Sequence, residues 1–431
     1  MKFAWRKHPL FTGTIILTAT GLASRVIGFL YKIFLTHTIG AVGLGIYQLV
    51  FPIFTVCLAL CVGGLQTAIS KYTVDYGDSR PFINGLCICT ITSFLCTFFI
   101  YQSAPFLAVH IIREADCTPL LRIISFSLPF ACVHACFNGY YYGKKKTAIP
   151  AVSQFLEQIV RVLSVYLFYQ ICIEQKTALT PALAMWGNLC GEIAAVLFCI
   201  STFSFQKMQI SASVMKKLLR FSSPLSGSRV ILHLFSSAES ILIPGALLSY
   251  GLTHTDALSV FGTLTGMALP VISLPTVLTG SVSVLLLPVI SEAAVHGDMQ
   301  RIRHAIFLTV KSCTFLGFGC TLIYLLFGRL FGQLLFHSTL AGAFIVSLGF
   351  LCPFLFLTHT LSSILHGLNL TRYTFLLNLL SCGLRLCTIV LLVPHFGLHV
   401  YLWSMLFSQL LQAVSYLILL LRKAKSAVCQ H

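Results

Sequence analysis

Long apolar runs, each with room to cross a lipid bilayer, follow one another along almost the whole 431-residue chain. A helix needs about 20 apolar residues to span the hydrocarbon core. Only 9% of the residues are charged, whereas soluble domains carry about 25%. The sequence therefore predicts an all-α integral membrane protein without a soluble domain. The twelve predicted transmembrane helices cover about residues 10–37, 44–72, 82–109, 119–142, 148–171, 178–203, 216–249, 257–293, 302–328, 338–367, 371–393 and 397–421.

Some of these runs are longer than a straight span requires, and they contain proline. Pro52 lies in the second run, and Pro270, Pro275 and Pro288 lie in the eighth. Proline and glycine interrupt membrane helices at recognisable places. We therefore expect bent or broken helices in these two runs.

The Lys and Arg residues alternate between two sets of connections. One set holds eighteen of them, and the other holds only Arg113, Lys176 and Arg329. Because short cytoplasmic loops carry the excess of Lys and Arg, the alternation predicts a cell-membrane protein with both termini in the cytoplasm. These loops account for most of the net charge of +17, which therefore does not indicate a nucleic-acid partner. The richer set is Lys2, Arg6, Lys7, Lys71, Arg80, Lys144, Lys145, Lys146, Lys207, Lys216, Lys217, Arg220, Arg301, Arg303, Arg372, Arg422, Lys423 and Lys425.

Seven further cations fall within the apolar runs, where a charge near the bilayer centre costs at least about 2.5 kcal/mol. Acidic residues are sparser there: all five Asp map to loops or helix ends, and only Glu157, Glu192 and Glu239 lie well inside the runs. The membrane interior is therefore predicted to be net cationic and to face a polar cavity. The seven cations are Arg25, Lys32, Arg122, Arg161, Arg229, Lys311 and Arg385.

A faint two-fold repeat divides the chain. The sequence SRVI at 24–27 in the first helix recurs at 228–231 in the seventh, and each copy follows a basic approach. Six helices separate the copies, so both halves have the same orientation, with a pseudo-two-fold axis along the membrane normal. We expect two six-helix lobes, residues 1–205 and 206–431, around a central cationic cavity.

Arg25 and Arg229 occupy equivalent positions in this repeat and are expected beside the cavity. Arginine offers a planar fork of donors to a phosphate and stays protonated when partly desolvated, so the pair suits an anionic headgroup. Lys32 lies two turns from Arg25 and would extend the cationic path, and Arg385 in the eleventh helix would line the second lobe. The structural alternative is that each arginine pairs with a buried acid or a backbone carbonyl and holds helices together.

Glu157 and Arg161 are four residues apart and share a helix face, so they are expected to form an ion pair. Glu192 and Glu239 have no partner nearby in the sequence. Each of them would bind a coupling cation or proton, or would neutralise an intramembrane arginine.

The histidines within spans are interpreted as polar packing. No HExxH, cysteine-rich ligand set or glycine-rich phosphate loop accompanies them, so neither a metal site nor another cofactor is predicted. These histidines are His134, His233, His359 and His366.

Two regions of the sequence carry a resemblance to a known family. Residues 24–29 read SRVIGF, 40–49 read GAVGLGIYQL and 67–70 read TAIS; residues 262–270 read GTLTGMALP and 287–292 read LPVISE. In these regions the chain resembles the stage V sporulation protein B branch of the oligosaccharide flippases. That branch belongs to the multidrug/oligosaccharidyl-lipid/polysaccharide exporter superfamily.

The resemblance implies an alternating-access transporter, not an enzyme, that moves lipid-linked oligosaccharide or peptidoglycan precursor from the inner to the outer leaflet. Its partners would be that anionic lipid-linked sugar, membrane lipids and enzymes of envelope glycan synthesis, in cell-wall formation or sporulation. Arg25 is similar to an arginine that the related lipid II flippases carry in the first helix. Their second arginine there is replaced by Tyr31, beside Lys32, and their arginine in the eighth helix has no counterpart at 263–267.

Three other functions compete with this one. A cation-coupled multidrug antiporter of the same superfamily would typically use intramembrane carboxylates, whereas here no Asp lies within a span and the interior is net positive. A membrane-embedded glycan enzyme usually needs acid–base or metal-binding groups on long outer loops, and the predicted outer loops are about ten residues or shorter. A non-transporting scaffold would not require the buried cations.

Overall fold

The computed structural model describes residues 9–204 and 209–426, without the side chains of 9–18, 281, 284–285, 287–288 and 423–426. Every regular element in these ranges is a helix, as predicted. The chain packs into two compact units, Met1–Ile241 and Leu242–His431. The predicted loop cations Lys2, Arg6, Lys7 and Lys207 lie outside the described residues.

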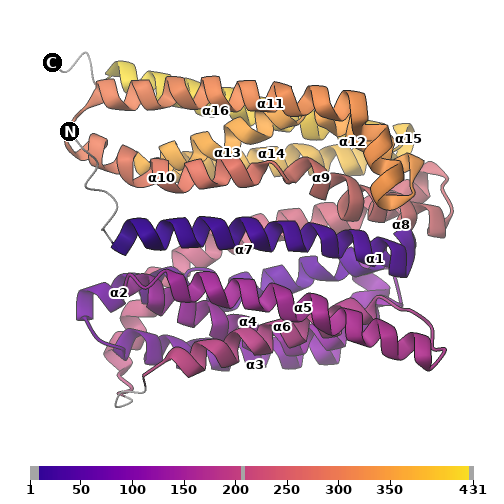
Figure 1. The fold of residues 1–431 in the computed structure, drawn as a ribbon, viewed down its shortest axis with the longest axis horizontal. Helices are drawn as coiled ribbons and strands as arrows, with labels where there is room; N and C mark the ends of the chain where they lie inside the picture. Colours follow the sequence, from indigo (N-terminus) through magenta and orange to yellow (C-terminus); the bar gives the residue numbers. More distant parts are fainter. Residues whose placement is uncertain (1–8, 205–208, 427–431) are drawn as a thin grey trace. The chain divides into compact units, whose positions relative to one another are not determined.

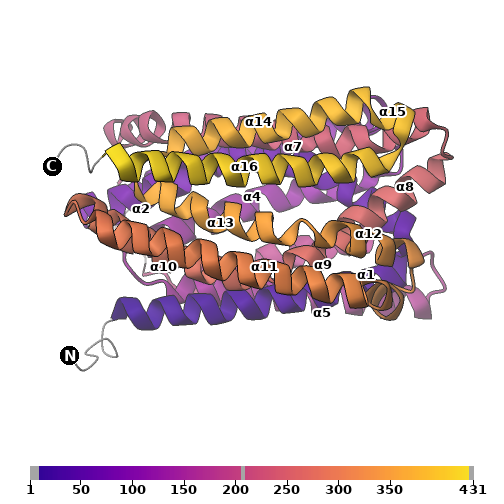
Figure 2. The same cartoon turned by 90° about the horizontal axis from the view of Figure 1, so that it is seen from above.

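The long helices of each unit run alongside one another (Figure 1). The first unit contains α1 (Pro9–Val62), α2 (Leu65–Tyr76), α3 (Arg80–Phe106), the π-helix η2 (Leu107–Ile112), α4 (Cys117–Gly143), α5 (Ala148–Glu174), α6 (Ala182–Thr202) and most of α7 (Ala212–Tyr250). The second contains α8 (His254–Gly262), the π-helix η3 (Thr263–Ala268), α9 (Leu269–Ser273), α10 (Thr276–Val295), α11 (Met299–Phe336), α12 (Thr339–Gly349), α13 (Cys352–Gly367), α14 (Thr371–Leu391), α15 (Val393–Phe396) and α16 (Leu398–Ser426). Figure 2 shows the same elements from above.

Ten helices of the described residues are long and apolar enough to cross a membrane, and α12 with α13, bent by 59°, makes an eleventh span. This confirms a multi-pass membrane protein. One of these spans, from Ala19 to Tyr76, takes in most of the first predicted run and the whole of the second. Counting the two runs separately brings the spans into agreement with the twelve predicted.

The predicted breaks occur in both long runs, but not always at the proline. The eighth run consists of α8, η3, α9 and α10, with Pro275 between the last two, so a broken helix is confirmed there. In the second run, Pro52 lies inside α1, and the break comes instead at Gly63 and Gly64, between α1 and α2.

Gly40 reverses the chain within α1. Its φ of 69° and ψ of −179° interrupt the helical dihedrals, in a region that essentially only glycine occupies. Figure 1 shows the result: α2 lies at the same end of the unit as the start of α1. The two predicted helices at 10–37 and 44–72 therefore form a hairpin joined by a single residue.

Small residues on α6 allow close packing against α5. Gly187 and Gly191 lie about one turn apart on α6. A Cβ atom at Gly191 would lie 2.8 Å from the carbonyl oxygen of Glu157, and one at Gly187 would overlap a methyl group of Val165. Membrane helices commonly approach each other through such pairs of small residues four apart.

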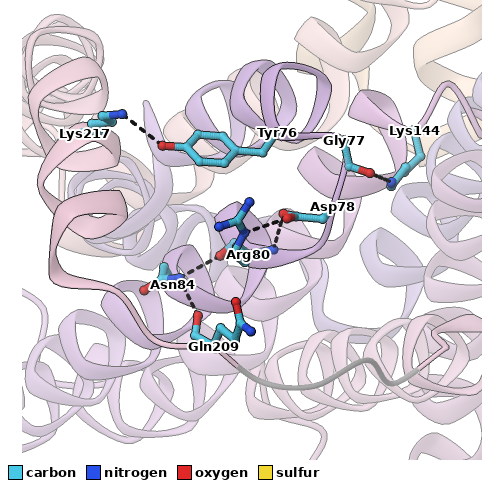
Figure 3. A network of polar contacts seen from close by, with 8 residues as sticks. All are labelled: Tyr76, Gly77, Asp78, Arg80, Asn84, Lys144, Gln209 and Lys217. Carbon is cyan, nitrogen blue, oxygen red and sulfur yellow. Dashed lines mark hydrogen bonds and ion pairs between the residues drawn. The ribbon is translucent and has the colours of Figure 1, made fainter.

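Loop cations from different connections meet at one end of the first unit, at the turn after α2 (Figure 3). The Nζ of Lys144, which follows α4, donates to the carbonyl oxygen of Gly77 at 2.6 Å. The Nζ of Lys217, on α7, donates to the hydroxyl of Tyr76 at 3.1 Å. Two cations of the richer set thus contact neighbouring residues at the end of α2.

Asn84 attaches the connection between α6 and α7 to this end of the unit (Figure 3). Its amide donates to the carbonyl oxygens of Arg80 and Gln209, at 2.8 and 3.0 Å. The same side chain accepts from the N–H of Ser211 at 2.8 Å. Beside it, Arg80 forms an ion pair with Asp78 at 2.6 Å.

In the second unit, a similar pair of glycines brings α11 against α12. Gly328 and Gly332 lie on α11, and a Cβ at Gly332 would collide with the backbone of Gly342 on α12. A core of buried side chains fills the opposite end of this unit, between α10, α11, α13 and α16. It includes Ile290, Ile302, Ile306, Leu361, Ile364, Leu365, Tyr416 and Leu420.

Candidate functional site

A polar cluster lies inside the first unit, and its first two members are Glu157 and Arg161 on α5. The guanidinium of Arg161 donates to the carboxylate of Glu157, and a second N–H donates to Oε1 of Gln158 at 3.1 Å. The two side chains are only 18% and 16% exposed. The spacing of four residues thus produces the expected pair, away from solvent.

Two residues from other helices complete the cluster. The Nδ1 of His134, on α4, lies 3.4 Å from Oε2 of Glu192, on α6, and 3.7 Å from Oε2 of Glu157. The imidazole is 6% exposed. Glu192, which had no partner nearby in the sequence, therefore has one on α4. His134, interpreted from the sequence as polar packing, lies at the centre of the cluster.

The glycine spacing on α6 explains how Glu192 reaches this position. Because Gly191 has no side chain, the backbone of α6 approaches the carbonyl oxygen of Glu157. The next residue, Glu192, is thereby carried alongside α5. The pair Gly187 and Gly191 was the sequence signal for this contact, and the prediction of the site did not use it.

A buried hydroxyl determines which nitrogen of His134 carries a proton. The Nε2 of His134 lies 2.9 Å from Oγ of Ser153, and this Oγ lies 2.9 Å from the carbonyl oxygen of Pro150. Ser153 is fully buried. A hydroxyl has one proton and a carbonyl can only accept, so Ser153 donates to Pro150 and accepts from Nε2–H. The other nitrogen, Nδ1, faces the two carboxylates.

The cations of the first helix lie along α1 where it meets α5. A Cβ at Gly28 would lie 3.3 Å from Nε2 of Gln158, the residue bonded to Arg161. Arg25 and Lys32 are three residues before and four residues after Gly28, on the same side of the helix. The side chain of Arg25 is exposed and that of Lys32 is half-buried.

Arg229 does not belong to the polar cluster and lies at the break between α1 and α2. Its guanidinium donates to the carbonyl oxygen of Gly63. One turn earlier on α7, Oγ of Ser226 accepts from the N–H of Gly64 at 2.8 Å. These side chains satisfy backbone groups that the helix break frees inside the membrane. This is the contact with a backbone carbonyl that the sequence left open, and headgroup binding by Arg229 stays a prediction.

The two remaining predicted site residues lie elsewhere. Glu239 is 6% exposed on α7. Arg385 belongs to the second unit, on α14, where its guanidinium lies 3.4 Å from Oγ of Ser408 on α16 and 3.4 Å from Sγ of Cys382. The roles predicted for both stay predictions.

The charges of the polar cluster would be balanced by one more positive charge. Two carboxylates, Glu157 and Glu192, face one guanidinium, that of Arg161. His134 and both carboxylates are the one set of donors in the described ranges that could hold an ion, with ligand atoms within 4.8 Å of one another. A divalent metal there would leave an unpaired positive charge beside Arg161, which is costly in a buried site. The arrangement therefore suits a single monovalent charge.

Comparison with known proteins identifies the family. The profile of the polysaccharide biosynthesis protein family matches residues 10–294. Stage V sporulation protein B of Bacillus subtilis (strain 168) is 26% identical over 415 residues, which cover 91% of this chain and 80% of that protein. Lipid II flippase MurJ of the same organism is 24% identical over 341 residues, which cover 71% of this chain and 62% of MurJ.

A solved structure shares the fold. The inward-facing conformation of a multidrug resistance MATE family transporter of the MOP superfamily matches with a TM-score of 0.75 at 15% identity. The match covers 96% of this chain and 98% of that one. The resemblance seen at 24–29 and 262–292 is thus confirmed. Because the family match covers well over half of the chain, the protein belongs to the polysaccharide biosynthesis protein family.

Proposed function

We propose that this protein is a flippase that moves a lipid-diphosphate-linked oligosaccharide or peptidoglycan precursor from the inner to the outer leaflet by alternating access. The family, the relatives named as a sporulation protein and a lipid II flippase, and the transporter fold all support this proposal. The observation that carries it is the pair of cations Arg25 and Lys32 on one side of an apolar helix.

In this proposal, Arg25 binds the diphosphate when the protein is open to the cytoplasm. Its planar fork pairs two donors with phosphate oxygens, and neutralising the headgroup lowers the cost of moving it through the membrane. Lys32, two turns further along α1, offers the next cationic contact. Arg229 and Arg385 would add positive charge from α7 and from the second unit as the two lobes rock.

Replacing Arg25 by alanine is expected to slow flipping at least tenfold, because a hydrogen bond to a charged group contributes about 1.5–3 kcal/mol. The measurement is translocation of labelled lipid-linked oligosaccharide by the purified protein in liposomes. Arg25→Lys should keep part of the rate, and Arg80→Ala, which removes a partly exposed cation at the start of α3, is the matched control. Wild-type rates in an Arg25→Ala protein that inserts normally would make Arg25 structural.

A multidrug antiporter is the second candidate, favoured by the carboxylates of Glu157 and Glu192 inside the first unit. Arg161 neutralises one of them, which weakens their attraction for a cationic drug. The same liposomes decide between the two functions. Uptake of a cationic dye without movement of any lipid-linked sugar would favour the antiporter.

We further propose that both termini lie in the cytoplasm and that enzymes of envelope glycan synthesis supply the substrate. The gathering of loop cations at the turn after α2 supports this orientation (Figure 3). An epitope inserted after Lys146 should be stained by antibody only in permeabilised cells, whereas one after Lys176 should be stained in intact cells. The reverse pattern would invert the topology.

A further inference from the structure

We propose that His134, Glu157 and Glu192 form a buried proton-binding site that takes up and releases one proton in each transport cycle. Its role in transport rests on the flippase function proposed above, whereas proton binding itself does not. The site lies among α4, α5 and α6 of the first unit.

The directions of the hydrogen bonds leave one position on His134 for this proton. Ser153 accepts from Nε2–H because its own proton goes to Pro150. If the imidazole is neutral, its Nδ1 lone pair then faces carboxylate oxygens at 3.4 and 3.7 Å. Acceptors that face one another in a buried site, without a proton between them, repel and stay unsatisfied. A proton on Nδ1 turns both contacts into attractive ones.

Charge balance leads to the same number of protons. With Arg161 paired to Glu157, the second carboxylate has no compensating charge unless His134 is protonated. Oε2 of Glu192 and Nε of Arg161 are buried without a hydrogen-bond partner. One proton makes the four-residue cluster neutral, and a second would give it a net positive charge. The expected stoichiometry is therefore one.

The groups around the cluster do not supply this charge. From α1, Tyr31 and Tyr47 are 5% and 6% exposed, and both lie near Arg161. From α6, Cys199 lies near Ser153. On other parts of α4, the thiols of Cys132 and Cys136 meet Cys89 of α3. None of these groups is cationic. Arg25 and Lys32 of α1 lie on the side of that helix that meets Gln158, but the charges that act on Glu157 are those of Glu192, Arg161 and His134.

Proton exchange needs only small changes. A proton from water adds to Nδ1 of His134, and no other bond forms or breaks. The carboxylates are 16% and 12% exposed, whereas the imidazole is 6% exposed, so they offer the path to water. Loss of the proton leaves two carboxylates facing the imidazole lone pair, which weakens the contacts that hold α4 against α5 and α6. Protonation would thereby bias the packing of this unit.

The site is tested first without transport, by NMR of the protein labelled with ¹⁵N-histidine in nanodiscs between pH 5 and 9. The His134 signals are assigned by their loss in His134→Gln. We expect Nε2 to stay protonated throughout and Nδ1 to titrate with one proton. In Glu157→Gln/Glu192→Gln, the ratio of protonated to neutral Nδ1 should fall at least about fivefold at a given pH, the lower end of typical coupling between sites.

His366 is a matched control within the same chain. Its Nε2 meets the hydroxyl of Thr374 at 3.0 Å, and that hydroxyl lies 2.8 Å from the carbonyl oxygen of Thr371. The relay is the same, but His366 forms no ion pair with a carboxylate in the part of the chain that the structure describes. The double Gln variant should leave its titration unchanged. A neutral His134 across the whole pH range, or a proton on Nδ1 with none on Nε2, would overturn the proposal.

Transport then tests the role of the proton. Flipping by the wild type should respond to an imposed pH gradient at least about fivefold, and His134→Gln should remove that response. A response to a sodium gradient at constant pH, but not to the pH gradient, would overturn the assignment of a proton. If the wild type moves no lipid-linked sugar while His134 titrates as expected, the flippase function fails and the proton site stands.

Discussion

Replacing Arg161 by methionine is expected to destabilise the protein by about 3–5 kcal/mol, the usual cost of removing one partner from a buried ion pair. Methionine fills a similar volume, so the change removes mainly the charge. It leaves the carboxylates of Glu157 and Glu192 near each other, with His134 as the remaining base. The free energy of unfolding is measured by denaturant titration in detergent micelles.

Two further variants show whether the cause is the charge. Arg161→Met/Glu157→Gln removes both charges of the pair and should recover most of the lost stability. Arg80→Met breaks the ion pair of Arg80 with Asp78, in which the two side chains are 40% and 35% exposed. It should lower the free energy of unfolding by only about 0–1 kcal/mol. Equal stability of Arg161→Met and Arg80→Met would show that the cluster is solvated and does not hold the helices together.

Gly191→Ala should cost about 1–3 kcal/mol, although alanine favours a helix, because overpacking displaces neighbouring groups. The new Cβ would lie 2.8 Å from the carbonyl oxygen of Glu157. This oxygen belongs to the backbone of α5, so the helices must separate. Since Glu192 follows directly, its distance from His134 should also increase. Thermal unfolding and the histidine titration described above would report both effects.

Other glycines provide the controls. A Cβ at Gly245 on α7 meets no atom within 4 Å, and alanine there should stabilise the helix by roughly 0.5–1 kcal/mol. In Gly187→Ala, the new Cβ would overlap the side chain of Val165. The double variant Gly187→Ala/Val165→Ala should therefore recover part of the stability that Gly187→Ala loses. A Gly191→Ala protein as stable as Gly245→Ala would contradict the close packing of α5 and α6.

The part of the site that the sequence predicted lies within one helix. Glu157 and Arg161 needed only the helical repeat to be paired, and the break of the eighth run needed only its prolines. The contact of Glu192 with His134 depends on the register of α6 against α4, which one sequence does not encode in any local pattern. The glycines at 187 and 191 did mark the close face of α6, and they are the signal that was overlooked.

The intramembrane arginines show a second limit. The position of Arg229 in an apolar run predicts that it needs a hydrogen-bond partner. A lipid headgroup and a backbone carbonyl can both accept from a guanidinium, so the sequence does not distinguish between them. The carbonyl of Gly63 is available only because α1 ends directly before it, and the sequence predicted a bent or broken helix in this run without giving that position. The need of Arg229 for an acceptor was thus predictable, whereas the identity of that acceptor depends on where the helix breaks.

The single-residue reversal at Gly40 also bears on how the chain is made. The two halves of α1 are joined at Gly40 without a polar loop. During membrane insertion there is therefore no soluble segment that could cross the membrane after the first half and before the second. The two halves would then enter the bilayer together as a preformed hairpin. Replacing Gly40 by a residue with a side chain should therefore impair membrane insertion and lower the yield of protein, whatever its effect on transport.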